Sequence, residues 1–201
     1  KQKRIALETL EIHARLADRL GMGRLKAQLE DAAFPYVYPE QYKKTLHIFD
    51  SMRPISDEQL TKVVETLKEE LSIFDVEIER IDHRIKHLYS LYQKLNRYKM
   101  DESKVHDVVA LRIIVPAVND CYQALGVIHG LYRPVPGRFK DYVAVPKPNG
   151  YRSLHTTIFS GDGNTLEIQI KTKDMHEEAE YGIASHLSYK ELGKGKSKEE
   201  I

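Results

Sequence analysis

Residues 153–171, SLHTTIFSGDGNTLEIQIK, decide the fold, because two strand-like runs flank a turn-rich segment. In the second run every other residue from Leu166 to Ile170 is apolar, so these residues share one face of a strand. The first run has the same alternation from Leu154 onward. Matching apolar positions across the pair requires a loop with an odd number of residues, and a three-residue loop over 161–163 meets that requirement. The stretch therefore predicts a β-hairpin.

The same register gives the hairpin a polar face. It aligns Ser153, His155 and Thr157 beside Glu167 and Gln169, which places a carboxylate in the middle of that face. A solvated sheet face is the ordinary explanation of such a pattern. The alternative is a site that uses the carboxylate.

Outward from the hairpin, strand and helix patterns alternate. From residue 75 onward we expect strands at 76–81 and 106–115 and helices at 84–98, 117–132 and 173–192. The run 106–115 is apolar on both faces, which favours an interior strand. This order predicts an α+β (α/β) fold with a mixed β-sheet flanked by helices.

The N-terminal part has a helical pattern without a strand signal. Apolar residues recur at helical spacing up to Leu20, and Gly21 and Gly23 then end the pattern. Further helices are expected at 24–34, which stops before Pro35, and at 39–52 and 61–74.

Composition limits the classes of function. The 201 residues are 41% hydrophobic, and their 31 basic and 30 acidic residues leave a net charge of +1. An anion site must therefore be built locally, because no global field attracts nucleic acid or a membrane. The single Cys121 excludes an internal disulfide, and we expect a cytoplasmic protein with no membrane contact, since no apolar stretch reaches the length of a membrane span.

The predicted helix 84–98 carries an aligned polar stripe. At about 100° per residue, Lys86, Ser90, Lys94 and Arg97 fall opposite the apolar stripe. A solvated basic face is one explanation. The stripe has no acidic residue to balance it, however, so a polyphosphate is a natural ligand.

The run 106–115 contains Asp107 near its start and Arg112 among apolar residues. Such an arginine needs a partner, either a carboxylate in a structural ion pair or a phosphate or aromatic ring of a ligand. Asp107 and Glu167 could supply two oxygen ligands from separate strands to a Mg²⁺ that is bound mainly through substrate phosphates.

The loop before the hairpin is basic and contains an aromatic ring at a turn. Lys140 and Lys147 lie in it, and Tyr151 follows directly after Asn149 and Gly150. A ring at a turn can stack on a base, although ordinary packing is the simpler explanation. Together, the carboxylates, the basic stripe and this loop indicate nucleotide phosphates and a metal ion.

Five segments together resemble the synthetase domain of the RelA/SpoT-type (p)ppGpp enzymes, over about residues 60–192. They are HRIKHLYSLYQKL, HDVVALRIIV, GRFKDYVAVPKPNGYRSLHTTI, LEIQIKT and MHEEAEYGIASHLSYK. The start of the chain is similar to the last helices of the hydrolase domain in the long bifunctional members. The resemblance implies a nucleotidyltransferase-like synthetase domain at 56–192, an all-helical hydrolase remnant and connector at 1–55, and the start of a linker at 193–201.

The resemblance also implies an activity and the residues that perform it. Members transfer the pyrophosphate of ATP to the ribose 3′-OH of GDP or GTP and release AMP, which is alarmone synthesis in the stringent response. It assigns Asp107 and Glu167 to catalysis and to Mg²⁺, with Glu167 also taking the proton of the attacking hydroxyl. ATP is assigned to Arg84, Lys86, Ser90, Lys94, Arg112 and Lys140, and GDP or GTP is assigned to Lys147, Asn149, Tyr151, His155 and Gln169.

Details of the resemblance set further expectations. The motif 138–141, RFKD, resembles the basic version of bifunctional members and implies that both GDP and GTP are accepted. Lys171 stands where the family commonly has arginine, which could weaken a phosphate contact. The hydrolase metal ligands lie upstream in the family, so hydrolysis is not expected. Ribosome or tRNA contact is expected only through parts of the long enzymes that this chain lacks.

Two rival functions remain open. A catalytically silent nucleotide-binding regulatory module would keep the pocket without turnover. An RNA-binding domain would use the basic helix and Tyr151, and its affinity would fall steeply with salt.

Overall fold

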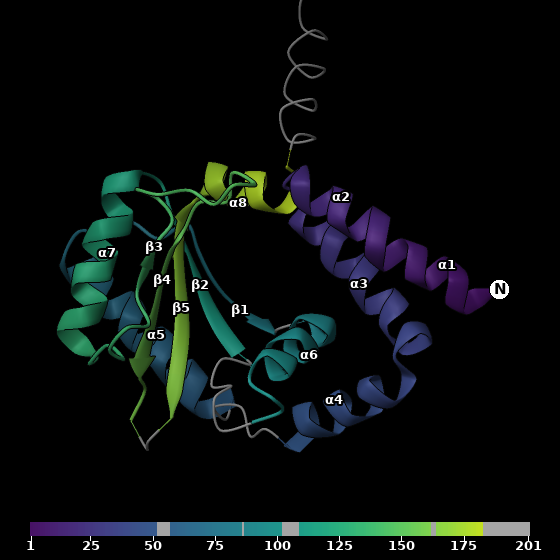
Figure 1. Ribbon diagram of the computed structural model, residues 1–201. Coiled ribbons are helices and arrows are strands. Elements are labelled where there is room, and N and C mark those ends of the chain that lie inside the picture. The colour runs from purple at the N-terminus through teal and green to yellow at the C-terminus, as the bar shows by residue number, and fades with distance from the viewer. Residues whose placement is uncertain (52–56, 86, 102–108, 162–163, 183–201) are drawn as a thin grey trace, which may run out of the picture.

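The computed structural model describes residues 1–51, 57–85, 87–101, 109–161 and 164–182, and its centre is a five-stranded sheet (Figure 1). The strand order is β1 (Arg80–Ile85), β2 (Val109–Val115), β5 (Thr165–Thr172), β4 (Leu154–Phe159) and β3 (Lys140–Asp141). Only β2 and β5 pair in parallel; the other neighbours are antiparallel. The predicted mixed sheet is confirmed, and β2 has a neighbour on each side, as its apolar run indicated.

The predicted hairpin register is also confirmed. Thr157 pairs with Glu167, and His155 pairs with Gln169. Beyond the strands, the Ser160 N–H donates to the Asn164 carbonyl oxygen at 3.0 Å. This pairing leaves residues 161–163 between them, which is the three-residue loop that the alternation required.

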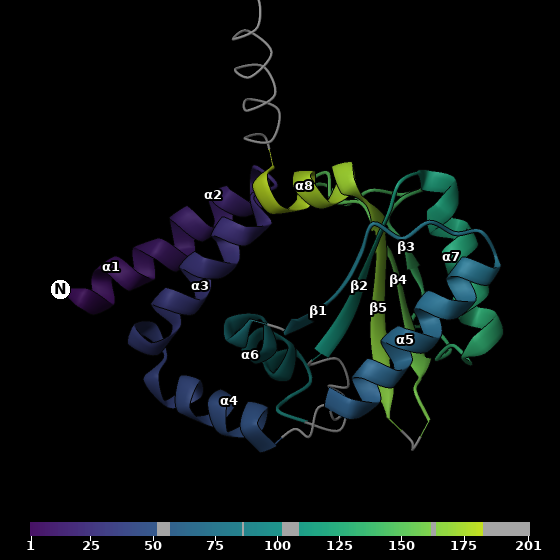
Figure 2. The same cartoon turned by 180° about the vertical axis from the view of Figure 1, so that it is seen from behind.

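One face of the sheet carries the main apolar core. Helices α5 (Asp57–Ile73) and α7 (Val118–Leu131) cover this face, as the two views show (Figures 1 and 2). Leu67 of α5 and Ile128 of α7 are fully buried against Leu111 and Ile168 of the strands. Removal of these apolar side chains from water stabilises the packing of both helices on the sheet.

The remaining helices lie on the other side of the sheet. Their bounds are α1 (Gln2–Glu8), the π-helical turn η1 (Thr9–His13), α2 (Ala14–Arg19), α3 (Gly23–Val37), α4 (Pro39–Ser51), α6 (Leu88–Arg97) and α8 (Lys173–Tyr181). The first three form one continuous helix that lies beside α3, and α8 joins this helical pair to the end of β5 (Figure 2). Among the helices that the structure describes, none has the length and apolar character needed to cross a membrane.

Aromatic packing connects three of these helices. Phe34 of α3 is fully buried, and its ring makes edge contacts with Tyr42 of α4 and Tyr89 of α6. It also stacks on Tyr92 of α6, with ring centroids 5.0 Å apart. This cluster holds α6 against the helical part of the chain.

Several predicted boundaries are wrong. The first strand lies at Arg80–Ile85, not at 76–81, and the next helix begins at Leu88, not at 84, because Arg84 and Ile85 pair with β2 instead of starting the helix. Helix α3 continues through Pro35 to Val37. In these cases sheet pairing and tertiary packing outweigh the local signals.

Candidate functional site

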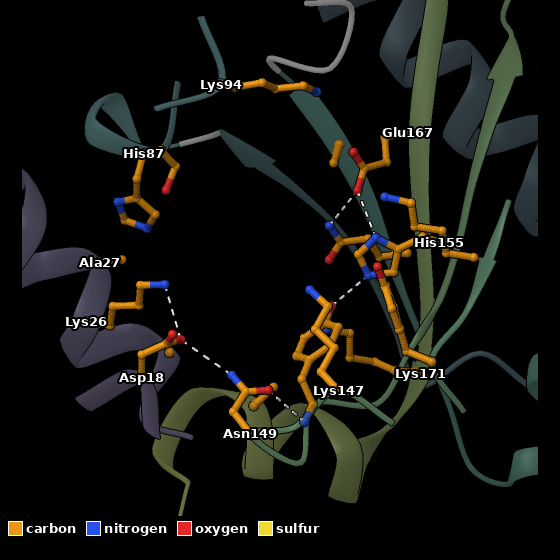
Figure 3. Close-up of a pocket in the computed structure, with 18 of the residues that line it drawn as sticks. Asp18, Lys26, Ala27, His87, Lys94, Lys147, Asn149, His155, Glu167 and Lys171 are labelled. Atoms are coloured by element: carbon orange, nitrogen blue, oxygen red, sulfur yellow. Dashed lines mark hydrogen bonds and ion pairs between the residues drawn. The ribbon is translucent and has the colours of Figure 1, made fainter. Parts of the chain in front are cut away.

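A cavity of about 960 Å³ opens between the polar face of the sheet and the helices α2, α3 and α6 (Figure 3). Most of the predicted site residues line it. They are Ser90, Lys94, Lys140, Lys147, Asn149, Tyr151, His155, Glu167 and Gln169. The polar face of the hairpin therefore lines a cavity, because helices enclose it instead of leaving it in bulk water.

Glu167 is held by two polar side chains of the hairpin. Gln169 donates its side-chain N–H to Glu167 Oε1 at 2.9 Å, and His155 Nδ1 lies 3.2 Å from the same oxygen. The carboxylate is only 16% exposed. A carboxylate that accepts two fixed hydrogen bonds keeps one orientation, which suits a group that acts on a bound substrate.

A chain of hydrogen bonds continues from His155 to a buried lysine. The Tyr151 hydroxyl lies 2.8 Å from His155 Nε2, and Lys171 donates to the tyrosine oxygen at 3.2 Å. Because an ionised carboxylate can only accept, His155 donates from Nδ1 to Glu167, and in the neutral imidazole Nε2 then accepts from the tyrosine hydroxyl. Burial lowers the pKa of His155, although the Glu167 carboxylate acts in the opposite direction.

The basic loop presents Lys147 between two rings. Its ammonium lies 4.6 Å from the centroid of Tyr142 and 4.8 Å from that of Tyr151. Burial, and then the charges of Lys140 and Lys26, lower the pKa of Lys147. Cations gathered in this way favour the binding of an anion.

Asn149 shapes the turn of the same loop. Its side-chain oxygen accepts from the Tyr151 N–H at 3.3 Å, and its amide donates to Asp18 Oδ1 at 3.4 Å. The backbone at Gly150 has φ of 79°, a conformation that favours glycine. The loop is therefore tied to helix α2 as well as to its own turn.

Ser90 and Lys94, two members of the predicted polar stripe, line the cavity from helix α6. Its first turn is held by Asp31 of α3, which accepts from the Tyr89 N–H at 3.0 Å and contacts His87 Nδ1 at 2.7 Å. Within the helix, Leu91 and Leu95 are fully buried on the opposite side. The helix is thus fixed by apolar packing on one side and by a cap from another helix.

One wall of the cavity was not predicted from the sequence. Asp18 of α2, and Lys26 and Glu30 of α3, line it from the helical part of the chain. Figure 3 shows the first two of these side chains. Lys26 Nζ lies 3.1 Å from Asp18 Oδ1 and 4.0 Å from Glu30 Oε1. A local signal for these residues is absent from the sequence, because charges at helical spacing equally indicate a solvated face.

Arg112 is not among the residues that line the cavity. Its guanidinium pairs with Asp82 on the neighbouring strand, with nitrogen–oxygen distances of 2.8 and 3.1 Å, and contacts Glu180 at 3.3 Å. The structural ion pair, one of the two explanations offered by the sequence, accounts for this arginine in the structure.

Three predicted site residues have side chains outside the described residues. Lys86 and Asp107 lie outside the described residues, and the side chain of Arg84 does too, although its backbone pairs with Ala110 in β1. The predicted metal pair of Asp107 and Glu167 therefore stays a prediction. Among the residues that the structure describes, no group of three or more metal-ligating side chains gathers in one place.

Comparison with known proteins gives one family match. A family described as "Region found in RelA / SpoT proteins" matches residues 83–194. The segment covers the second half of β1, α6 and all later strands of the sheet.

Relatives of known name are much longer than this chain. A guanosine-3′,5′-bis(diphosphate) 3′-pyrophosphohydrolase from Aquifex aeolicus is 50% identical over 95% of this chain and 27% of its own length. A GTP pyrophosphokinase from Streptomyces coelicolor is 46% identical over 95% of this chain and 22% of its own length. The chain thus spans about a quarter of the length of these relatives.

A solved structure has a similar fold. The small alarmone synthetase 2 from Bacillus subtilis superposes with a TM-score of 0.52 and 30% sequence identity, over 77% of this chain and 83% of that one. This likeness supports the predicted fold class.

Proposed function

The chain belongs to the RelA/SpoT family, and on that premise we propose that it transfers the pyrophosphate of ATP to the ribose 3′-OH of GDP or GTP. In this reaction the 3′-oxygen attacks the β-phosphorus, the bond from that phosphorus to the α,β-bridging oxygen breaks, and AMP leaves with the oxygen. The products are AMP and guanosine tetra- or pentaphosphate.

The observation that carries the proposal is the fixed carboxylate of Glu167 in a cavity lined by cations. Such a transfer requires an aligned acceptor oxygen, β-phosphorus and leaving oxygen, together with compensation of phosphate charge. Glu167 would take the proton of the 3′-hydroxyl. His155 and Gln169 would keep its oxygen oriented while the hydroxyl approaches.

The two nucleotides would occupy different sides of the cavity. Ser90 and Lys94 of α6, with Lys140 of β3, would bind the phosphates of ATP. On the other side, Lys147 and Asn149 would bind the acceptor nucleotide. Tyr151 would offer its ring to the guanine base, while its hydroxyl stays bonded to His155.

The metal in this proposal is Mg²⁺. Glu167 supplies hard carboxylate oxygens inside a cavity large enough for polyphosphates, which fits an ion held by one or two carboxylates and by substrate oxygens. Glu167, with Asp107 as second ligand, would hold it. When bound, it would neutralise part of the phosphate charge.

The test is a transfer assay with labelled ATP, GDP and Mg²⁺ and with separation of the guanosine tetraphosphate formed. The chain should form product, and Glu167→Gln should lower the rate at least about a hundredfold, because it removes the proton acceptor while keeping the shape of the side chain. The matched control is Glu69→Gln, an exposed carboxylate on α5, which should leave the rate unchanged.

Either of two results would count against this assignment. Equal product from Glu167→Gln and the wild-type chain would remove Glu167 from its role. A wild-type chain that binds both nucleotides but forms no product would favour the silent binding module.

A further inference from the structure

The helical wall of the cavity contains a cation, Lys26, that has no role in the proposed reaction. Lys26 lines the cavity from α3, and its side chain is 32% exposed. In Figure 3 its ammonium group points into the open space, opposite Glu167 and His155. It reaches the site from a helix that lies far from the sheet residues in sequence.

The cavity has an excess of positive charge that its own carboxylates do not balance. Of the described residues that line it, eight are cationic and five are acidic, although the whole chain has a net charge of only +1. The cations are Arg19, Lys26, Lys94, Arg97, Arg138, Lys140, Lys147 and Lys171, and the acids are Asp18, Glu30, Glu167, Glu178 and Glu180. A polyanionic ligand would complete this charge balance.

Lys26 stands on the acceptor side of the cavity. Asp18 accepts from both Lys26, at 3.1 Å, and Asn149, at 3.4 Å, so one carboxylate joins Lys26 to the proposed acceptor loop. The charge of Lys26 also contributes to the lowered pKa of Lys147 on that loop. An anion bound near Lys147 would therefore lie within the influence of both ammonium groups.

We propose that Lys26 is a phosphate-binding residue for the acceptor nucleotide, held ready by Asp18 and Glu30 until the 5′-phosphates of GDP or GTP arrive. This inference rests on the proposed function for the identity of the acceptor. It makes the helical hairpin of α2 and α3 a part of the binding site, and a lysine is suited to the task because its flexible ammonium group can exchange one anionic partner for another.

Binding measurements by titration calorimetry test this role, with GDP and guanosine as the probes. In Lys26→Met the affinity for GDP should fall about tenfold, because a charge-assisted hydrogen bond to phosphate is lost, whereas the affinity for guanosine should stay unchanged. Lys26→Arg should retain most of the GDP affinity. Lys44→Met, which removes an exposed lysine on α4, is the matched control and should change neither affinity.

A second background separates attraction by Lys26 from repulsion by its former partner. Lys26→Met leaves the Asp18 carboxylate without its ammonium partner, so the same substitution is made in Asp18→Asn. If Lys26→Met also lowers the affinity for GDP about tenfold in this background, direct phosphate binding is supported. An unchanged GDP affinity there, or an equal loss for guanosine and GDP, would overturn the proposal.

The outcome is distinguishable from that of the transfer assay. If the chain binds GDP through Lys26 but makes no product, the subsite stands and the proposed activity fails. If product forms and Lys26→Met binds GDP like the wild type, the activity stands and the subsite fails. A wild-type chain without affinity for GDP would overturn both.

Discussion

At the scale of single residues, the polar face of the sheet depends on buried ionisable groups with defined partners. Lys171 is only 2% exposed, and its ammonium donates to the Tyr151 hydroxyl. Arg112, whose side chain is 16% exposed, is paired through two nitrogens with Asp82. Burying such a charged group without a partner would cost on the order of several kcal/mol in lost hydration. The fold therefore requires these contacts.

A partly buried histidine of α8, His176, makes the free energy of unfolding depend on pH. His176 lies 2.9 Å from Arg80 and 3.5 Å from Arg112, and burial, followed by the Arg112 charge, lowers its pKa to about 4. The neutral form is therefore favoured in the folded state. The unfolded chain takes up its proton near pH 6.5, so the contribution is complete above that pH and is lost as the pH falls toward about 4.

We predict that His176→Gln reduces the acid sensitivity of the fold. Between pH 7.5 and 5 the wild-type chain should lose about 2 kcal/mol of unfolding free energy through this histidine, and the variant should not. Denaturant unfolding followed by circular dichroism at the two pH values measures the difference. His13→Gln, at an exposed position of η1, is the control, and the prediction fails if both variants show the same pH dependence.

At the scale of elements, α6 depends on a cap that comes from another helix. Its own N-cap residue, His87, makes no side-chain capping bond, and Asp31 of α3 accepts from the Tyr89 N–H in its place. The cavity residue Ser90 lies in this first turn of α6, and Lys94 lies one turn later. The position of the proposed ATP-binding helix is therefore set by α3.

Asp31→Ala should loosen α6 and weaken ATP binding. We expect a loss of about 1 kcal/mol in unfolding free energy from the missing cap. We also expect a rise of up to about tenfold in the KM for ATP, with a smaller change in the KM for GDP, because Ser90 and Lys94 shift relative to the acceptor side. Steady-state kinetics and denaturant unfolding measure the two effects.

The conservative variant distinguishes positioning from a general loss of structure. Asp31→Asn keeps an oxygen acceptor for the Tyr89 N–H and should restore most of the ATP affinity. Equal increases in both KM values for Asp31→Ala would contradict the element-scale prediction.

At the scale of the whole molecule, close backbone contacts at two glycines join the helical hairpin of α2 and α3 to α8, the helix that follows β5. A Cβ atom added at Gly23 would lie 2.5 Å from the Ala179 carbonyl oxygen of α8, and one added at Gly182 would overlap the Leu20 carbonyl oxygen. The turn between α2 and α3 therefore packs directly on the C-terminal end of α8. This contact brings Asp18 and Lys26 to the site.

Gly23→Ala should separate these two parts. The added methyl group meets backbone atoms that cannot rotate away, so we expect a loss of about 1–3 kcal/mol in unfolding free energy. Gly126→Ala in α7 is the matched control, because nothing lies within 4 Å of its added Cβ, and there alanine should stabilise the helix slightly. Thermal unfolding of both variants provides the comparison, and equal midpoints would contradict the proposed close contact.

Local patterns were sufficient for the hairpin and for most of the sheet face. The period of two in β4 and β5 fixed which residues share a face, and the apolar requirement fixed the register that pairs Thr157 with Glu167. The same periodicity argument placed Ser90 and Lys94 on one face of α6. The predicted start of that helix was wrong, because the pairing of Arg84 with β2 is a long-range contact that leaves no local signal in the sequence.

The sequence by itself determined the strand register, the mixed sheet and the family, because these follow from spacing and from motifs that neighbouring residues carry. Only the tertiary structure decided that Asp18 and Lys26 line the cavity, that Asp31 caps α6, and that Arg112 is held in an ion pair instead of lining the cavity. The physical reason is that an exposed charge on a helix is compatible with solvent or with a ligand. Which of the two it meets depends on the packing of distant segments, here the close contact of α3 with α8.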